Sequence, residues 1–303
     1  MAKKPAVVFL VGPTAIGKTA AAIQLAKALK TEIVSADSRQ FYREMPIGTA
    51  HPSATERAEI PHHFVDFLPV TAEFSAGSYE RAVLNFFGDY FEKNTSIVVT
   101  GGSGLYVNAL ANGFDALPHD PAVRQKLNET LEEKGLAYLQ SRLLALDPEH
   151  YEAMDIQNPQ RLIRALEVCI VSGLKYSALR QDAPSDRPFD AIWVGLTASR
   201  DVMYDRINTR VDAMIDAGLE AEVRRLLPHR DLNALNTVGY NEWFDHFDGK
   251  LTRDEAIDKI KQHTRNFAKR QMTWFGRNEA ITWFDREQVK EMIAHTIEQI
   301  RER

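Results

Sequence analysis

Residues 12–19 read GPTAIGKT, and they lie between two stretches that predict regular structure. The six apolar residues AVVFLV at 6–11 run directly into this octet, and AAAIQLAKALK at 20–30 runs directly out of it. A buried strand, a glycine-rich loop ending in Lys-Thr and a helix form the Walker A arrangement, or P-loop. Backbone N–H groups of such a loop converge on phosphate oxygens at the positive end of the helix. The octet therefore predicts a ligand that carries phosphate.

Two side chains of this loop have specific expected roles. Lys18 can reach the outer phosphates, and the hydroxyl of Thr19 can bind Mg²⁺. A strand-to-helix turn that binds nothing is the alternative. The expected phosphate-binding set is the whole loop: Gly12, Pro13, Thr14, Ala15, Ile16, Gly17, Lys18 and Thr19.

Composition places the chain among ordinary globular proteins. The 303 residues are 44% hydrophobic and 26% charged, enough for about two domains or one domain with a large insertion. Cys169 is the single cysteine, which excludes a disulfide framework and a Cys-based zinc site. It lies in an apolar helical run and is expected to be a buried structural thiol. No secretory signal precedes the first strand and no apolar run approaches ~18 residues, so we expect a cytoplasmic protein without membrane contact.

The net charge of −5 gives no general attraction to nucleic acid, but one segment differs. From 259 to 277 there are six basic residues and no acid, with Phe267, Trp274 and Phe275 among them. Thr252 and Glu255 form a capping box that would start a helix here. A solvated helix face is the alternative, but a cluster of one sign favours a large anionic partner. The basic residues are Lys259, Lys261, Arg265, Lys269, Arg270 and Arg277.

Apolar runs alternating with helical stretches predict the fold class. EIVSA at 32–36, SIVVT at 96–100 and AIWVGLT at 191–197 join the first strand in an α/β protein, a P-loop parallel sheet flanked by helices. Ligands gather at the carboxyl ends of parallel strands. Gly12–Thr19, Asp37–Gln40 and Thr100–Ser103 are therefore expected to line one crevice.

Between these strands lies a segment of different character. Prolines open and close residues 117–188, apolar residues recur there at helical spacing, and no strand pattern is present. We expect a small all-helical insertion domain at 117–188. The P-loop core would then comprise 1–116 and 189–303, its second part mostly helical, with Ser199 capping one helix whose end is marked by Gly218.

The acids that follow the early strands indicate which phosphate chemistry the P-loop serves. ATPases and GTPases usually carry a second strand-end aspartate, yet the strand at 96–100 ends in threonine and two glycines. Asp37 is the one acid that follows an early strand. It could be a helix cap or turn residue, or a carboxylate that binds Mg²⁺ or accepts a proton from a nucleophile. Its position at the ligand edge favours the second interpretation.

Eight motifs in order resemble those of the tRNA isopentenyltransferase family, the bacterial tRNA dimethylallyltransferases, over nearly the whole chain. DSRQ beside a P-loop, with NPQRLIRALE and KRQMTWF downstream, is much more specific than the P-loop alone. The motifs are GPTAIGKT (12–19), SADSRQFY (35–42), IGTAHP (47–52), GGSGLYVNAL (101–110), NPQRLIRALEV (158–168), RINTRVDAMIDAGLEAEV (206–223), TVGYNE (237–242) and TRNFAKRQMTWFGR (264–277).

The resemblance implies an enzyme that transfers the dimethylallyl group of dimethylallyl diphosphate to N6 of the adenine 3′ of the anticodon in tRNA. Asp37 would orient the amine and take its proton. Lys18, Mg²⁺ and an arginine would stabilise the departing diphosphate. Arg210 matches the family position for that arginine, and Arg206 is the second choice. The adenine would be flipped out of its stack.

The resemblance also implies the tRNA contacts. The helical insertion would close on the anticodon stem-loop, and the basic helix would face tRNA phosphates. We expect a monomer with no protein partner. The implied tRNA-binding residues are Asp37, Ser38, Arg39, Gln40, Ser103, Arg124, Gln160, Arg161, Leu162, Ile163, Arg164, Asn236, Thr237, Val238, Gly239, Tyr240, Asn241, Lys269, Arg270, Gln271, Met272, Thr273, Trp274, Phe275 and Gly276.

Departures and alternatives remain. Ser103 stands where many relatives have threonine, and the C-terminal zinc finger of eukaryotic relatives has no counterpart here. His62 and His63 are interpreted as structural residues, because adjacent side chains need not face one ion. The leading alternative function is an ATP-dependent P-loop small-molecule kinase with Asp37 as base for a hydroxyl group. A non-catalytic, nucleotide-gated RNA-binding module is the second.

Overall fold

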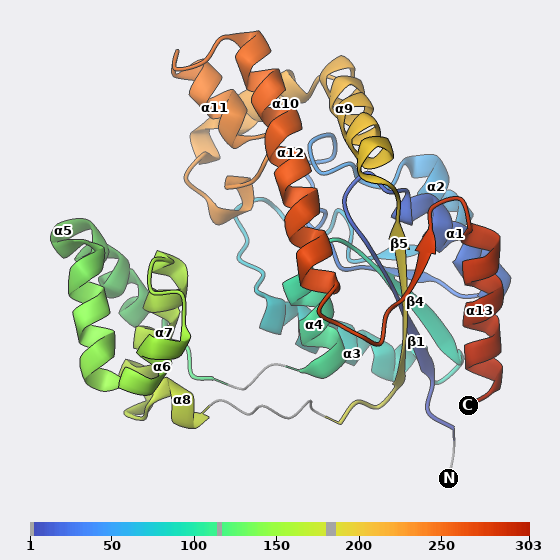
Figure 1. The fold of residues 1–303 in the computed structure, drawn as a ribbon, viewed down its shortest axis with the longest axis horizontal. Coiled ribbons are helices and arrows are strands. Elements are labelled where there is room, and N and C mark those ends of the chain that lie inside the picture. Colours follow the sequence, from blue (N-terminus) through green and yellow to red (C-terminus); the bar gives the residue numbers. More distant parts are fainter. Residues whose placement is uncertain (1–2, 114–116, 180–185) are drawn as a thin grey trace. The chain divides into compact units, whose positions relative to one another are not determined.

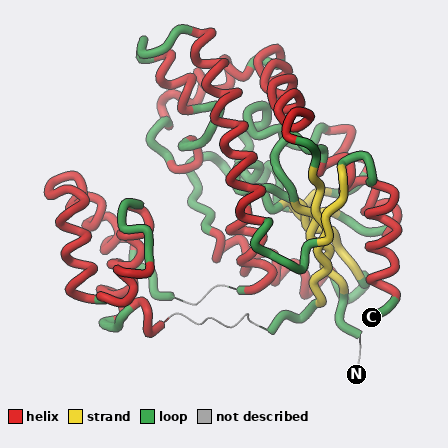
Figure 2. The backbone as a smooth tube through the Cα atoms, viewed as in Figure 1, coloured by secondary structure: helices red, strands yellow, loops and turns green. Residues whose placement is uncertain are grey.

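The computed structural model describes residues 3–113, 117–179 and 186–303. They divide into two compact units, which we describe separately. Unit 1 is Met1–Asn112 with Arg187–Arg303, and unit 2 is Gly113–Asp186. Figure 2 shows that the strands lie in unit 1, whereas unit 2 is built from helices and loops.

Unit 1 contains a parallel sheet, which confirms the expected α/β fold class (Figure 1). In the described residues its strand order is β3-β2-β4-β1-β5-β6. The strands are β1 (Ala6–Val11), β2 (Ile33–Ser35), β3 (His62–His63), β4 (Ser96–Thr100), β5 (Asp190–Thr197) and β6 (Thr282–Asp285). Strands β1 and β4 lie in the middle and are almost entirely buried, as continuous apolar runs predict.

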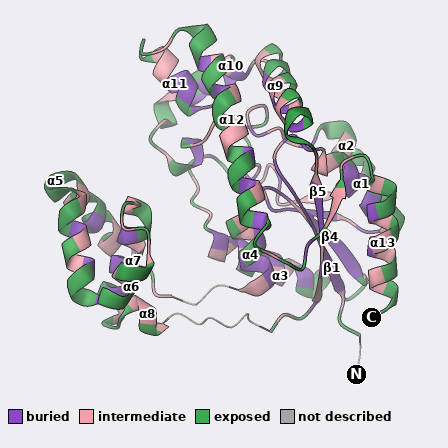
Figure 3. Ribbon diagram, viewed as in Figure 1, coloured by how far each residue is buried: buried purple, intermediate pink, exposed green. Residues whose placement is uncertain are grey.

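Helices cover both faces of this sheet. Buried residues of α1 and α13 pack on one face, and those of α3, α4, α10, α11 and α12 belong to the core on the other. Figure 3 shows the buried residues on the strands and on the helix sides that face them. The helices of unit 1 are α1 (Lys18–Leu29), α2 (Ala54–Glu59), α3 (Ala76–Tyr90), α4 (Gly104–Asn112), α9 (Arg200–Asp216), α10 (Leu219–Leu226), α11 (Asn241–Phe247), α12 (Arg253–Phe275) and α13 (Val289–Arg301), with short 3₁₀ helices at Leu227–His229 and Asn233–Leu235.

Unit 2 has its own hydrophobic core. Helix α5 contributes Leu127, Leu139 and Leu143, and α7 contributes Leu166 and Cys169 among others. The cysteine is buried, as expected. The helices are α5 (Pro121–Leu146), α6 (Pro148–Ala153), α7 (Pro159–Ser172) and α8 (Tyr176–Leu179). Gly135 interrupts α5 with φ 76°, a left-handed conformation that favours glycine.

Several expected boundaries are confirmed by local hydrogen bonds. The side chain of Ser199 accepts from Val202 N and starts α9. Thr252 and Glu255 form the reciprocal capping box at the start of α12. Helix α1 begins two residues before the expected 20–30, because Gly17 is its left-handed N-cap. In the described residues no helix is both long and apolar enough to cross a membrane.

Candidate active site

The P-loop lies between β1 and α1 with a backbone that needs glycine at both ends. Gly12 has φ 148°, and a Cβ there would come within 2.6 Å of Leu196 O on β5. Gly17 has φ 108°. Thr19 follows in the first turn of α1, half-buried. The loop is therefore held tightly against the sheet, with the helix N-terminus behind it.

Lys18 folds over this loop. Its Nζ donates to the carbonyl oxygens of Gly12 (3.0 Å) and Pro13 (2.7 Å). Burial lowers the pKa of Lys18 from 10.5 to about 7, while nearby Asp37 raises this pKa and nearby Arg210 lowers it. An anionic ligand would favour the protonated amine and raise the pKa again. Lys18 is therefore a cation whose charge depends on what occupies the loop.

Asp37 and Arg210 reach the same place from different elements. Asp37 follows β2, and its Oδ1 accepts a hydrogen bond from Arg39 N (3.1 Å), so it caps a turn rather than a helix. Arg210 lies in the middle of α9, where burial lowers its pKa and Asp37 raises it. Asp37 thus lies close enough to Lys18 and Arg210 to raise the pKa of both.

Arg206 is the second choice for the catalytic arginine, but in this structure it binds the backbone of the P-loop. Its Nε donates to Ala15 O in the P-loop (2.8 Å). The contact braces the loop from α9, one turn before Arg210. The family resemblance ranked Arg210 first, and in the structure Arg210 is the arginine whose charge acts on Lys18 and is itself affected by Asp37.

The segment after Asp37 is fixed by a small network. Ser103 Oγ accepts from Ser38 N (2.9 Å) and donates to Ser38 Oγ (3.0 Å). Arg39 donates to the carbonyl oxygens of Asn233 (2.7 Å) and Asn236 (3.1 Å). These contacts join the carboxyl ends of β2 and β4 to the loop before α11, as the strand-end argument predicts.

Gln40 extends this network to the motif at 47–52. Its Nε2 donates to the carbonyl oxygens of Thr49 (3.2 Å) and Ala50 (2.9 Å), and its Oε1 accepts from Ser35 Oγ (3.2 Å). Ser35 Oγ in turn accepts from Asp37 N (3.3 Å). The backbone of Asp37 is therefore held by Ser35, whose hydroxyl group is in turn bound by Gln40.

Glu222 supports the same motif from α10, and sequence reasoning missed it. The carboxylate is fully buried and accepts from Ile47 N (2.8 Å), Gly48 N (2.9 Å) and Tyr240 Oη (2.7 Å). A Cβ on Gly48 would lie 2.5 Å from Tyr240 Oη. Glu222 lies inside the quoted motif 206–223, but its partners are far away in sequence.

Gln271 connects α12 to the P-loop. This nearly buried side chain accepts from Thr14 N through Oε1 (2.8 Å) and donates to Gly102 O through Nε2 (2.9 Å). Gly102 and Gly104 have no room for a side chain, because a Cβ would meet Gln271 at 2.2 Å and Trp274 at 2.3 Å. Gln271 thus supports the phosphate loop, a role that its place among the implied tRNA contacts did not suggest.

The implied tRNA residues of α12 divide into two sets. Lys269 and Arg270 are exposed, and Trp274 is 39% exposed. Phe275 is buried in the core. Met272 is half-buried, whereas Thr273 and Gly276 are exposed. One face of the helix therefore offers cations and an indole ring to solvent.

The loop Asn236–Asn241 is similarly divided. Asn236 and Asn241 are exposed, and Asn241 Nδ2 donates to Asn236 Oδ1 (3.0 Å). Thr237 and Val238 are half-buried, whereas Tyr240 is completely buried. Buried Glu242 holds the turn by accepting from Gly239 N (2.8 Å), and His263 Nδ1 lies 2.5 Å from its other oxygen.

In unit 2 the expected residues are also of two kinds. Gln160 and Arg161 are exposed, whereas Leu162 and Ile163 are fully buried core residues. Arg124 and Arg164 are half-buried and pair with Glu167 Oε2 at 2.7 and 2.8 Å. Arg124, Arg164 and Glu167 thus form one group of ion pairs in unit 2. The side chains of Leu162 and Ile163 are buried and are not available to a ligand in this structure.

Glu167 is a buried acid whose charge is compensated by two arginines. Although burial raises its pKa, the ion pairs to Arg124 and Arg164 and a hydrogen bond to His119 (2.7 Å) lower it to about 2. The carboxylate is therefore ionised at any physiological pH.

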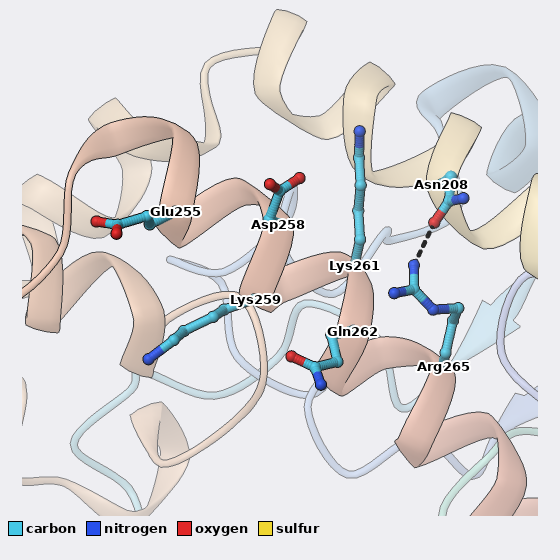
Figure 4. Close-up of a pocket in the computed structure, with 7 residues that line it drawn as sticks. All are labelled: Asn208, Glu255, Asp258, Lys259, Lys261, Gln262 and Arg265. Atoms are coloured by element: carbon cyan, nitrogen blue, oxygen red, sulfur yellow. Dashed lines mark hydrogen bonds between the residues drawn. The ribbon is translucent and has the colours of Figure 1, made fainter.

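Two cavities lie elsewhere in unit 1. The larger, of about 540 Å³, is bordered by Asn208 of α9 and the first half of α12 (Figure 4). Its charged residues are of both signs, so it does not select phosphate. The smaller, of about 270 Å³, lies between α11 and α12. Neither is lined by Lys18, Asp37 or Arg210.

The oxygen donors beside the P-loop are of the type that binds a divalent metal ion. Thr19 and Asp37 supply oxygen donors at the same sheet edge, the ligand type that Mg²⁺ prefers alongside phosphate and water. The part of the chain that the structure describes contains no group of three or more His, Cys, Asp or Glu side chains able to hold a metal. His63 instead lies 2.6 Å from Glu32, and His62 Nδ1 lies 2.7 Å from Ile60 O.

Fold and site together define a P-loop protein with a candidate phosphate site beside a carboxylate. The IPP transferase family model matches residues 40–279. The tRNA dimethylallyltransferase of Christiangramia forsetii is 48% identical over 277 residues, 91% of this chain and 92% of the relative. That of Flavobacterium johnsoniae is 47% identical and covers 95% of this chain and 96% of the relative. The chain belongs to the IPP transferase family.

Two solved structures share the fold, and the first of them also supports the family assignment. The crystal structure of the tRNA isopentenylpyrophosphate transferase from Bacillus halodurans is 35% identical with a TM-score of 0.74, covering 99% of this chain and 98% of that one. A eukaryotic dimethylallyltransferase acting on tRNA is 24% identical and shares the fold, with a TM-score of 0.79 over 93% of this chain and 74% of that chain.

Proposed function

We propose that this chain transfers the dimethylallyl group of dimethylallyl diphosphate to N6 of the adenine immediately 3′ of the anticodon in tRNA. It is thus a prenyltransferase that releases diphosphate. The observation that carries the proposal is the meeting of Asp37, Lys18 and Arg210 at the P-loop of a chain in the IPP transferase family.

The P-loop would bind the diphosphate rather than a nucleotide. The loop lies at the N-terminus of α1, the end of a helix that favours anions, and Lys18 and Arg210 would add two cations. Mg²⁺, with Thr19 as a ligand, would neutralise part of the diphosphate charge. No attacking water has to be activated in this reaction, which agrees with the absence of an acid after β4 at 101–103.

Asp37 would act on the other reactant. The adenine amine is a poor nucleophile because its lone pair is delocalised into the ring. As the new N6–C1 bond forms, the C1–O bond to diphosphate breaks, the bonding electrons leave with the diphosphate, and the amine proton passes to the Asp37 carboxylate. The adenine has to leave its stack to reach this position.

The tRNA would approach over α12, whose Lys269, Arg270 and Trp274 are exposed. Cations contact backbone phosphates, and an exposed indole offers a surface for base stacking. Unit 2, with exposed Gln160 and Arg161, would contribute further contacts to the anticodon stem-loop.

The test is mass analysis of tRNA nucleosides after incubation with the protein, dimethylallyl diphosphate and Mg²⁺ but without ATP. We expect an adenosine that carries one additional five-carbon prenyl group, and release of one diphosphate per transfer. Strict dependence on ATP, with release of ADP, would contradict the proposal and favour the small-molecule kinase.

A further inference from the structure

Three cationic side chains surround one tyrosine ring where α9 packs against α12. The charged centres of Arg200, Arg265 and Lys269 lie 5.1, 5.7 and 5.8 Å from the ring centroid of Tyr204. We call these four residues the Tyr204 cluster. The two helices that carry them lie side by side (Figure 1).

Within the described residues the three cations of the cluster form no ion pair, although Glu255 and Asp258 line the same cavity as Arg265. Arg265 donates to Asn208 Oδ1 (2.7 Å), a neutral partner (Figure 4). Lys261, one turn earlier on α12, is paired with Asp212 at 2.6 Å. The charges of α12 are thus compensated at Lys261 and uncompensated from Arg265 onward.

Tyr204 fixes the position of these cations next to the P-loop. Its ring packs against a small core made of Ala15, Met203, Ile207 and Ala268. Lys269 beside the hydroxyl group lowers the pKa of Tyr204, and burial opposes this. Because Ala15 belongs to the P-loop, the cluster lies beside the diphosphate site without containing Lys18 or Arg210.

Like charges gathered around one ring repel each other, and a bound anion removes this repulsion. A multivalent anion that spans neighbouring helices matches the arrangement better than a free diphosphate, for which the P-loop already provides converging amides. Lys269 also belongs to the exposed basic face that continues to Arg270 and Trp274. We propose that the Tyr204 cluster binds a backbone phosphate of the tRNA and docks it beside the active site. This inference rests on tRNA being the substrate.

The test is the Arg200→Gln/Arg265→Gln double variant, which keeps the aliphatic stems and leaves Lys269 in place. We expect the Kd for tRNA to rise on the order of tenfold at low salt. The slope of log affinity against log salt should become shallower by up to about 0.7 to 0.9, because the cluster neutralises one backbone phosphate. The KM for dimethylallyl diphosphate should stay unchanged.

Two further variants separate charge from structure. Arg200→Lys/Arg265→Lys should recover most of the salt dependence, because the charges remain. Lys290→Ala/Arg301→Ala removes the same charge from α13, which packs against α1, β5 and β6, and should leave the slope as in the wild type. Thermal melting of each variant shows that the fold is intact.

Unchanged tRNA affinity and salt slope in the Gln variant would overturn the inference. So would a variant that retains its tRNA affinity but loses inhibition by inorganic pyrophosphate, because the cluster would then bind a free anion. Binding is measured directly, so its outcome does not depend on catalysis. A wild-type protein that binds tRNA but transfers no prenyl group would contradict the proposed function and leave the docking site standing.

Discussion

At the residue scale, the charge of Lys18 links the structure to an observable pH dependence. Its pKa of about 7 in the ligand-free protein means that the amine is protonated below this pH and neutral above it. Because only the protonated amine attracts diphosphate, kcat/KM for dimethylallyl diphosphate should fall as pH rises through about 7. The pH profile of kcat/KM checks this.

Lys18→Arg provides the control, since a guanidinium stays charged throughout this range. Its activity will be lower if the geometry is disturbed, but the decline near pH 7 should be absent. A wild-type profile that stays flat between about pH 6 and pH 9 would show that Lys18 is protonated throughout.

At the element scale, one contact joins α12 to the P-loop. Gln271→Leu would leave Thr14 N and Gly102 O without their partners, and each unsatisfied buried group typically destabilises by about 1–3 kcal/mol. We expect a lower free energy of unfolding and a higher KM for dimethylallyl diphosphate. Urea unfolding and steady-state kinetics measure the two effects.

Gln262→Leu is the matched control, because Gln262 is exposed on the same helix. It should change neither quantity appreciably. If Gln271→Leu destabilised the fold but left the KM unchanged, the contact would be structural and would not shape the phosphate loop.

Glu222 holds the segment around Gly48 in a similar way. In Glu222→Gln an amide NH₂ replaces one acceptor oxygen, so a donor faces a donor in a buried site. We expect a loss of about 1–3 kcal/mol or more in the free energy of unfolding. Tyr240→Phe removes a single hydrogen bond to Glu222 and should be milder. Equal stability of wild type and Glu222→Gln in urea unfolding would show that the carboxylate is not needed there.

Sequence patterns predicted the local parts of this architecture well. The apolar runs before the P-loop and at 96–100 correspond to β1 and β4, and the Thr252–Glu255 capping box starts α12. The edge strands β3 and β6 were missed, because two and four residues give too short a pattern. Gln271 and Thr14 lie 257 positions apart, so no local pattern could reveal their contact.

In the candidate site, too, the sequence predicted the local features and missed the contacts that depend on packing. The rule that ligands gather at the carboxyl ends of parallel strands correctly brought Asp37 to the P-loop. It could not choose between Arg206 and Arg210, because both lie on one helix and only packing determines which contacts Ala15 O. Arg124 and Arg164 look like free cations in the sequence, and buried Glu167 explains why they are paired.

At the scale of the whole molecule, a net charge of −5 coexists with a basic surface on α12. Lys269→Ala/Arg270→Ala should weaken tRNA binding and make the salt slope shallower by about 1.4 to 1.8. Binding of diphosphate should be nearly unchanged, because the proposed diphosphate site is the P-loop. Titrations of tRNA at several salt concentrations test this, and an unaltered slope would mean that α12 is only a solvated face.

The central claim is that Asp37 is the base for prenyl transfer at the P-loop. The most direct measurement is the single-turnover rate of prenyl transfer to tRNA by Asp37→Ala, with the tRNA Kd determined for the same variant. We expect the chemical rate to fall by about a hundred- to ten-thousand-fold while the Kd stays close to that of the wild type. A chemical rate equal to that of the wild type at saturating tRNA, with only the Kd increased, would contradict it.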